Sequence, residues 1–234
     1  MLNVLLSTNE LSRLSSELEH QSAEEIIRLA AQMIPNITFA CSFGSEDMVI
    51  LDLIMKVNPS LPIFYLDTDV LFPETYDLRD EVIKLYNPNL IQVRSELTLK
   101  QQAQQYEESL WERSPDVCCS IRKVQPLENH LRGYDGWITG IRRQQSPTRA
   151  NAQLFEQDHR FGLIKVNPIV FWSEDDVWQY IKDHNVPYNV LHDQGYPSIG
   201  CLHCTKAVKP GEDPRSGRWA GFAKTECGLH QEIG

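Results

Sequence analysis

Short apolar runs alternate with amphipathic segments along most of the chain. Five runs have the length and composition of buried strands, at residues 37–41, 63–66, 90–93, 137–141 and 163–166. Helical periodicity predicts helices at 11–33, 46–57 and 73–86, in a polar stretch ending at 105, and at 174–184. Strands that alternate with helices indicate βαβ units, so the expected fold is α/β with a mostly parallel, Rossmann-like sheet flanked by helices.

Polar or basic turns follow three of the predicted strands. Parallel sheets bind ligands at the carboxyl ends of their strands. We therefore expect the turns after residues 41, 66 and 141 to converge on one edge of the sheet.

The first of these turns contains small residues and opens a helix. Gly44 permits close backbone approach, and Ser42 and the helix N-terminus offer donors to an anion. The turn lacks the Gly-Lys-Ser/Thr ending of a Walker loop. After the second strand, Asp67 and Thr68 are candidates for ribose hydroxyls, with helix capping as the alternative.

The third turn is basic, with Arg142, Arg143 and Arg149 in one loop. The planar fork of arginine suits sulfate and phosphate oxygens. A second basic group follows late in the chain and includes Arg215 and Arg218. A solvated surface is the alternative for either group.

Composition narrows the choice of ligand. The 234 residues are 41% hydrophobic and 23% charged, with a formal net charge of −10, which is typical of a globular protein. Local basic groups in an acidic chain favour a small anion over nucleic acid. No apolar run of membrane-spanning length and no signal peptide are apparent, so we expect a cytoplasmic protein that binds neither nucleic acid nor membrane.

Four of the six cysteines form two pairs, Cys118 with Cys119 and Cys201 with Cys204. Four thiolates can hold zinc or an iron–sulfur cluster, and a single CxxC also suits redox chemistry. Structural zinc sites usually space their ligands by two or more residues, so the adjacent pair favours a cubane cluster with several iron corners. The alternative for this pair is packing inside a helix. We expect Cys41, which lies within an apolar strand, to be a buried packing residue.

The chain changes character after residue 187, where Gly, Pro and charged residues replace apolar periodicity. We predict one α/β domain at residues 1–204 and a mobile C-terminal segment at 205–234. Cys227 lies near the end of this segment, where Lys224 and His230 would favour its thiolate and Gly228 would leave the backbone free to turn.

Taken together, these segments resemble the assimilatory adenylyl-sulfate and phosphoadenylyl-sulfate reductases over nearly the whole chain. The matching segments are 42–44, 66–69 with 73–76, 118–119 with 121–123, 140–149, 201–204 and 226–230. The resemblance implies an adenine nucleotide alpha hydrolase-like fold. Both cysteine pairs are typical of the branch that carries one four-iron four-sulfur (4Fe-4S) cluster, and some members of that branch accept either nucleotide.

The resemblance also implies a two-step reaction. Cys227 would attack the sulfur of adenylyl sulfate, AMP would leave, and thioredoxin or glutaredoxin would release sulfite from an S-sulfocysteine. It implies that Cys118, Cys119, Cys201 and Cys204 ligate the cluster. The implied substrate-binding residues are Ser42, Gly44, Asp67, Thr68, Lys123, Arg142, Arg143, Arg149, Arg215, Arg218 and His230.

The resemblance also bears on assembly, because the family often forms dimers or tetramers.

Other functions stay open from the residues alone. A related fold serves ATP pyrophosphatase-type ligases and thiolation enzymes, but the first turn reads Ser-Phe-Gly-Ser-Glu-Asp and lacks their Ser-Gly-Gly-x-Asp-Ser. An iron–sulfur or zinc sensor would leave the basic loop unexplained.

Overall fold

A six-stranded sheet forms the centre of the computed structural model, which describes residues 6–222, 224, 226, 228 and 229. The strand order is β3-β2-β1-β4-β6-β5. The strands are β1 (Ile37–Ala40), β2 (Ile63–Asp67), β3 (Leu90–Arg94), β4 (Gly136–Ile138), β5 (Phe155–Asp158) and β6 (Leu163–Val166). All neighbours pair in parallel except β5, which runs antiparallel to β6 at the edge. The predicted α/β class is confirmed. The sheet contains one strand, β5, that was not predicted.

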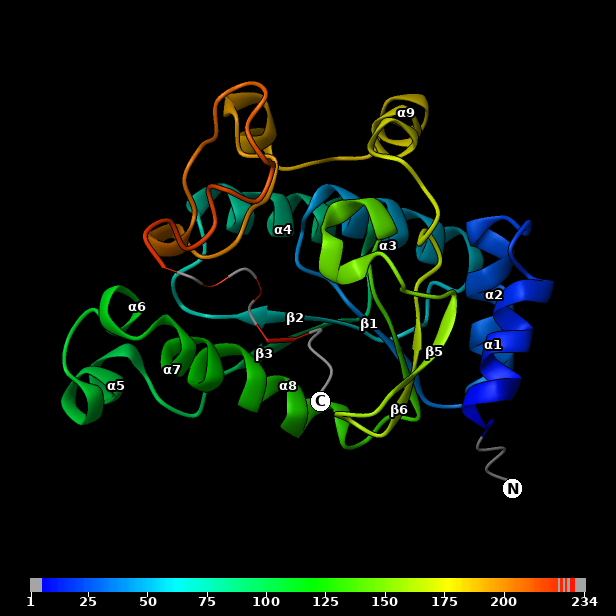
Figure 1. Cartoon of the computed structure of the whole chain (residues 1–234), viewed down its shortest axis with the longest axis horizontal. Helices are drawn as coiled ribbons and strands as arrows, with labels where there is room; N and C mark the ends of the chain where they lie inside the picture. Colours follow the sequence, from blue (N-terminus) through cyan, green and yellow to red (C-terminus); the bar gives the residue numbers. More distant parts are fainter. Residues whose placement is uncertain (1–5, 223, 225, 227, 230–234) are drawn as a thin grey trace.

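Helices cover both faces of the sheet. In Figure 1, α3 and α4 lie above the strands and α8 lies below them. The described helices are α1 (Thr8–Glu17), α2 (Ala23–Met33), α3 (Ser45–Val57), α4 (Pro73–Tyr86), α5 (Leu99–Tyr106), α6 (Leu110–Arg113), α7 (Pro115–Cys119), α8 (Gln125–Leu131) and α9 (Glu174–His184). None of the described helices is long and apolar enough to cross a membrane.

The core forms around β1 and α3. Residues 48–51 of α3 are fully buried, as are Phe39 of β1 and Ile63 of β2. Strand β1 pairs with β2 on one side and with β4 on the other, and Phe39 aligns with both Ile63 and Ile138. This register places the carboxyl ends of the three strands on the same edge of the sheet, with β2 extending three residues beyond the partner of Ala40.

The prediction of one continuous helix at 11–33 is wrong. The structure has two helices, because α1 ends at Glu17 and Ser22 begins α2 by accepting a hydrogen bond from the Glu25 amide. A serine cap supplies a partner that the first turn of a helix otherwise lacks. The polar stretch between the helices offers no apolar face to continue the packing.

The segment that follows α6 was not predicted in detail. Helix α7 continues through a π-helical turn (Ser120–Val124) directly into α8. Such turns re-aim side chains within an otherwise regular helix. Here the turn presents Arg122 and Lys123 just after the adjacent cysteines.

Candidate active site

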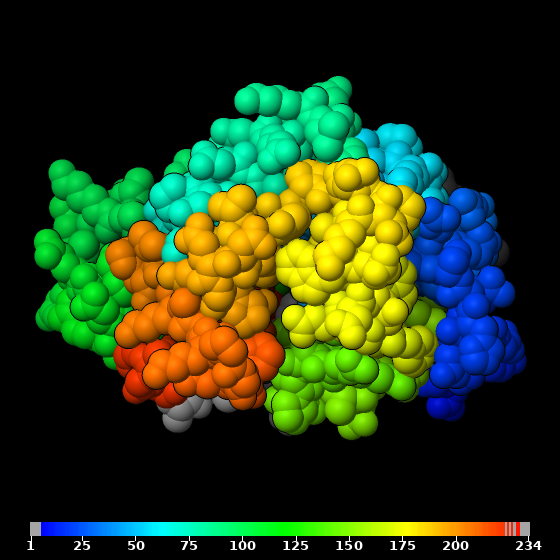
Figure 2. All heavy atoms as spheres, turned by 90° about the horizontal axis from the view of Figure 1, so that it is seen from above, coloured from blue at the N-terminus to red at the C-terminus, as the bar shows by residue number. Residues whose placement is uncertain are grey.

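A cavity of about 840 Å³ opens at the carboxyl ends of β1, β2 and β4. Its lining includes the turns after β1 and β4, at residues 41–47 and 139–142, together with Tyr65 and Leu66 of β2 and Leu71 beyond that strand. Residues from α9 and from the late segment 208–215 complete the wall. Figure 2 shows the surface hollowed between these last two segments, coloured yellow and orange. The turns after residues 41 and 141 converge at this cavity as predicted, whereas the turn after residue 66 contributes only Leu71 to the described lining.

The first turn presents the N-terminus of α3 to this cavity. Gly44 stands at the N-cap position without a side-chain cap, so the first amides of α3 have no capping side chain. Phe43 adopts a positive φ of 60°, which turns the chain sharply before the helix. Ser42 and Gly44 therefore both line the cavity, as the sequence indicated.

Asp47 in the first turn of α3 is a titratable group that the sequence did not single out. Its Oδ2 accepts hydrogen bonds from the Ser42 amide at 2.6 Å and the Ser42 hydroxyl at 2.5 Å. Burial raises the pKa of Asp47 to about 6 despite these bonds. A Cβ at Gly140 would collide with its carboxylate, which explains the glycine there.

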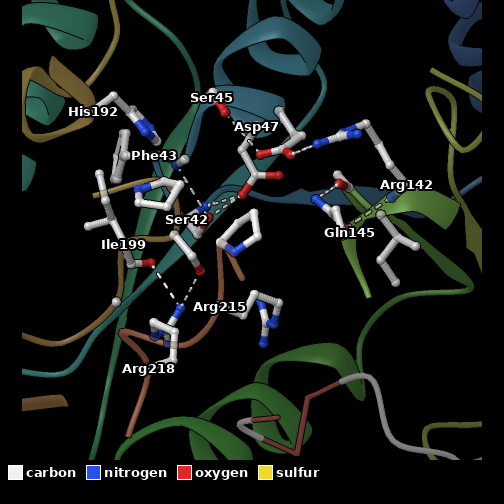
Figure 3. Close-up of a pocket in the computed structure, with 18 of the residues that line it drawn as sticks. Ser42, Phe43, Ser45, Asp47, Arg142, Gln145, His192, Ile199, Arg215 and Arg218 are labelled. Carbon is white, nitrogen blue, oxygen red and sulfur yellow. Dashed lines mark hydrogen bonds and ion pairs between the residues drawn. The ribbon is translucent and has the colours of Figure 1, made fainter. Parts of the chain in front are cut away.

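Arg142 forms a buried ion pair on the same wall (Figure 3). Its Nε lies 3.0 Å and its Nη2 2.8 Å from Oε1 of Glu46. Burial alone would raise the pKa of Glu46, but the charge of Arg142 and the hydrogen bonds from Gln145 and Arg142 together hold that pKa below its usual value. Arg142 lines the cavity with its charge already balanced by a carboxylate.

Arg149 and Arg215 converge on a single carboxylate, that of Glu226. Arg149 donates from Nε at 3.2 Å and from Nη2 at 3.1 Å, and Arg215 donates from Nη2 at 3.0 Å. Glu226 is only 5% exposed, and all three residues line the cavity. The sequence had indicated the two arginines but not the acidic partner beside Cys227.

The other predicted arginines differ in placement. Arg218 lines the cavity, where its Nη1 donates to the Ser198 hydroxyl at 3.1 Å and its guanidinium stacks on Trp219 (Figure 3). Arg143 points elsewhere: it donates to the Ala152 carbonyl and lies over the Phe171 ring. Arg143 is not among the described residues that line the cavity.

Asp67 and Thr68 are buried beneath the site and do not appear in the described lining. Asp67 accepts hydrogen bonds from Tyr76 at 2.7 Å and Gln92 at 2.5 Å. The Thr68 hydroxyl lies 3.3 Å from Sγ of Cys201. Both side chains thus have partners within the protein in this structure.

One end of the cavity is aromatic. Trp178 packs edge-on against Tyr188 and His192, and Phe43 also lines this region. Burial lowers the pKa of His192, whose Nε2 is buried without a hydrogen-bond partner. The neutral, flat surfaces here suit an uncharged ring, in contrast to the cationic wall.

All four paired cysteines line a second, small cavity. Cys118 and Cys119 reach it from the end of α7, and Cys201 and Cys204 from a late loop. Within the described part of the chain, no three cysteine, histidine or carboxylate side chains are arranged to hold one metal ion. A cubane binds each thiolate at a different iron corner, so it suits four separated thiols around one space.

The lining of this small cavity contains further support for such a group. Nη2 of Arg122 is buried without a hydrogen-bond partner, although Nη1 and Nε bind Asp69 and Gln102. Burial, followed by the neighbouring thiols, raises the pKa of Cys118 to about 12 and of Cys204 to about 11. A positively charged metal group would reverse this and favour thiolates. The residues fit an iron–sulfur cluster.

The two cavities share part of their walls. Lys123, Arg218 and Trp219 line both of them. A ligand in the large cavity would therefore lie beside the four cysteines. Cys227 and His230 lie outside the residues that the structure describes.

Asp47 makes the stability of the protein depend on pH. Its carboxyl is protonated more readily in the folded chain than in the unfolded chain, so its contribution is full below about pH 4 and is lost as the pH rises through about 6. Asp47→Asn should remove this loss. Relative to that variant, the free energy of unfolding of the wild type should fall by about 3 kcal/mol over this range.

Urea titrations at a series of pH values would measure this difference. Asp77→Asn, at an exposed position on α4, serves as the matched control. A constant gap between wild type and Asp47→Asn would show that Asp47 is not the group responsible.

Comparison with known proteins agrees with this geometry. Residues 36–207 match the phosphoadenosine phosphosulfate reductase domain. An adenosine 5'-phosphosulfate reductase of Halalkalibacterium halodurans is 48% identical, over 94% of this chain and 96% of its own. A second, from Bacillus subtilis, is 52% identical over 84% of both chains.

Solved structures place the fold in the same group. The phosphoadenylyl-sulfate reductase of Candida auris, a phosphate complex, has a TM-score of 0.79 at 32% identity, over 88% of this chain and 99% of its own. The FMN adenylyltransferase of Candida glabrata shares the fold alone, with a TM-score of 0.58 at 15% identity, over 91% of this chain and 74% of its own. The chain belongs to the phosphoadenosine phosphosulfate reductase family.

Proposed function

We propose that this protein reduces adenylyl sulfate to sulfite and AMP, through an S-sulfocysteine on Cys227, with thioredoxin as the reductant in assimilatory sulfate reduction. One observation carries the proposal: a nucleotide-sized cavity with a cationic wall adjoins a cavity lined by four cysteines. The names of relatives about 50% identical over most of the chain support the same substrate.

The two ends of the large cavity suit the two ends of adenylyl sulfate. The aromatic end around Trp178 and His192 would take the adenine ring. The sulfate and phosphate oxygens would lie toward Lys123, Arg149, Arg215 and Arg218. The basic side chains would be in place before the AMP leaving group develops charge, which lowers the barrier without reorganisation.

The covalent step exchanges one sulfur bond for another. The Cys227 thiolate attacks the sulfur of adenylyl sulfate, the bond from that sulfur to the phosphate oxygen breaks, and AMP leaves with the electron pair. A thiolate of the reductant then attacks Sγ of Cys227 and displaces sulfite. The second thiol of the reductant resolves the mixed disulfide, so the dithiol supplies both electrons. His230 is proposed as a substrate-binding residue of the same segment.

Cys118, Cys119, Cys201 and Cys204 would hold one 4Fe-4S cluster. When bound, this cluster would have a structural role and an electrostatic effect on the anionic substrate. Lys123 lines both cavities and would couple the cluster to the substrate.

The proposed division at residue 204 assigns the reacting cysteine to a segment that moves between steps. The described part of that segment is tied to the body, since the Trp219 amide donates to the Cys204 carbonyl and the Val208 amide to the Gly195 carbonyl. Movement would therefore involve the chain beyond Trp219. Glutaredoxin as the reductant, and a dimer or tetramer as the assembly, are further possibilities that the family suggests.

Cys227→Ser should bind AMP normally and release no sulfite, because a hydroxyl is a far poorer nucleophile than a thiolate. Mass spectrometry of the wild type mixed with adenylyl sulfate, before any reductant is added, should show a sulfonate increment on the peptide that contains Cys227. Sulfite formation at the normal rate by the variant would exclude Cys227 as the nucleophile.

Cys201→Ser should lose most of its iron and sulfide and the associated visible absorption. The change removes a proposed ligand whose position is fixed by the hydrogen bond from the Leu202 amide to the Val70 carbonyl. Metal and sulfide analysis of the purified protein would check this, with Cys41→Ser as the control for losing a buried cysteine. Stoichiometric zinc without sulfide in the wild type would contradict the cluster.

The alternative substrate is phosphoadenylyl sulfate, as in the Candida auris relative. The relatives that are about 50% identical carry the name adenosine 5'-phosphosulfate reductase, which favours the nucleotide without the 3'-phosphate. We therefore expect kcat/KM for adenylyl sulfate to exceed that for the 3'-phosphorylated nucleotide by at least about tenfold, equivalent to about 1.4 kcal/mol. Equal values for the two nucleotides would identify a dual-specificity enzyme.

A further inference from the structure

The chain on either side of residue 227 is fixed by three contacts with different parts of the body. Glu226 meets the two arginines described above. The Gly228 carbonyl accepts a hydrogen bond from Nη1 of Arg160. Leu229 packs against an apolar group formed by Phe64, Leu127, Leu131, Trp137 and Leu163.

The contact at Glu226 is electrostatic and almost entirely buried. Its carboxylate accepts hydrogen bonds from both guanidinium groups, and the Thr148 hydroxyl lies 3.4 Å away. Buried ion pairs depend strongly on both partners, because removing one leaves the other charge unpaired.

The contact at Leu229 is apolar and lies on the other side of residue 227 in the chain. Its partners come from β2, α8, β4 and β6, which belong to the rigid body of the fold. Gly228 adopts a φ of 84°, a conformation that side chains other than glycine rarely take. This glycine lets the chain turn between the charged contact and the apolar one.

We propose that Glu226 and Leu229 are positioning residues that hold the segment around Cys227 against the cavity during attack on the substrate. Both side chains line the large cavity, one at its cationic wall and one beside Leu127 and Trp137. This inference rests on the proposed function, since it assigns a role to the neighbours of the proposed nucleophile. Neither residue touches the reacting atoms in this role.

The proposal separates the two halves of the reaction. Attack by the Cys227 sulfur requires the segment to be held at the cavity, so weakening either contact should slow formation of the S-sulfocysteine. Release of sulfite requires a protein dithiol to reach the same sulfur, so weaker contacts should leave this step equal or faster. A residue needed only for folding would impair both steps.

Leu229→Ala is the sharpest test, because Leu229 packs against an apolar group that includes none of the proposed anion-binding arginines. Rapid mixing of the purified, cluster-containing enzyme with adenylyl sulfate and no reductant measures the rate of S-sulfocysteine formation. We expect a loss of about tenfold, the scale for removing most of a leucine side chain from a partly buried site. The Kd of AMP, measured by calorimetry, should change by less than about twofold.

A second variant tests the charged contact. Glu226→Gln keeps the shape and removes the charge, and it should also slow adduct formation, whereas Glu226→Asp should recover part of the rate. Phe222→Ala is the matched control, since Phe222 is an exposed apolar residue of the same segment and does not line the cavity. It should react as the wild type does.

A measurement without chemistry keeps this inference separate from the proposed function. Trypsin should cleave after Lys224 faster in Leu229→Ala than in the wild type or Phe222→Ala, because the segment leaves the body more often. If the wild type forms no adduct, the proposed function fails, whatever the cleavage rates are. If Leu229→Ala is cleaved and sulfonated at wild-type rates, or loses AMP binding in proportion to its rate, the positioning role is wrong.

Discussion

The parallel pairing of β1 with β2 and with β4 is the constraint on which the rest of the structure depends. Because the three strands are parallel and Phe39 aligns with both Ile63 and Ile138, the turns that follow them lie on one edge of the sheet. The space between these turns is small: Gly140 lies so near Asp47 that no side chain fits there. The register of three short strands thus fixes the relative positions of Ser42, Asp47 and Arg142.

The buried arginines at this edge are paired with carboxylates, which are abundant in this acidic chain. The buried guanidinium of Arg122 meets Asp69, that of Arg142 meets Glu46, and Arg149 and Arg215 share Glu226. Pairing of this kind offsets the cost of removing a charge from water. At Glu226, two guanidinium groups converge on one carboxylate next to the cavity of about 840 Å³.

Periodicity predicted the strands well because the central ones are short, apolar and buried on both faces. It missed β5, whose Phe155–Asp158 sequence carries two acidic residues and pairs only at the sheet edge. The sequence also placed Arg142 and Arg143 together, although Arg142 has an extended backbone and Arg143 begins a 3-10 helix. Only packing decided that Arg142 faces the cavity and that Arg143 covers Phe171.

Polar residues at strand ends were equally ambiguous. Asp67 resembles a ligand-binding carboxylate in the sequence, but Tyr76 and Gln92 occupy its oxygens. Glu226 gave no signal of its own, because its partners Arg149 and Arg215 are distant in the chain. The cysteines were predictable as a set, since their pairing is visible in the sequence without knowledge of the fold.

The origin of those cysteines in two remote segments has a mechanical consequence. Residues 118–119 continue into α8, whereas the loop at 201–204 reaches the body through the bridge between Leu71 and Cys201. An inorganic group bound by all four sulfurs would act as a cross-link that closes a long loop of chain, including β4, β6 and α9. Cross-links of long loops restrict the unfolded ensemble the most, so the cofactor would contribute to resistance against denaturation as well as to chemistry.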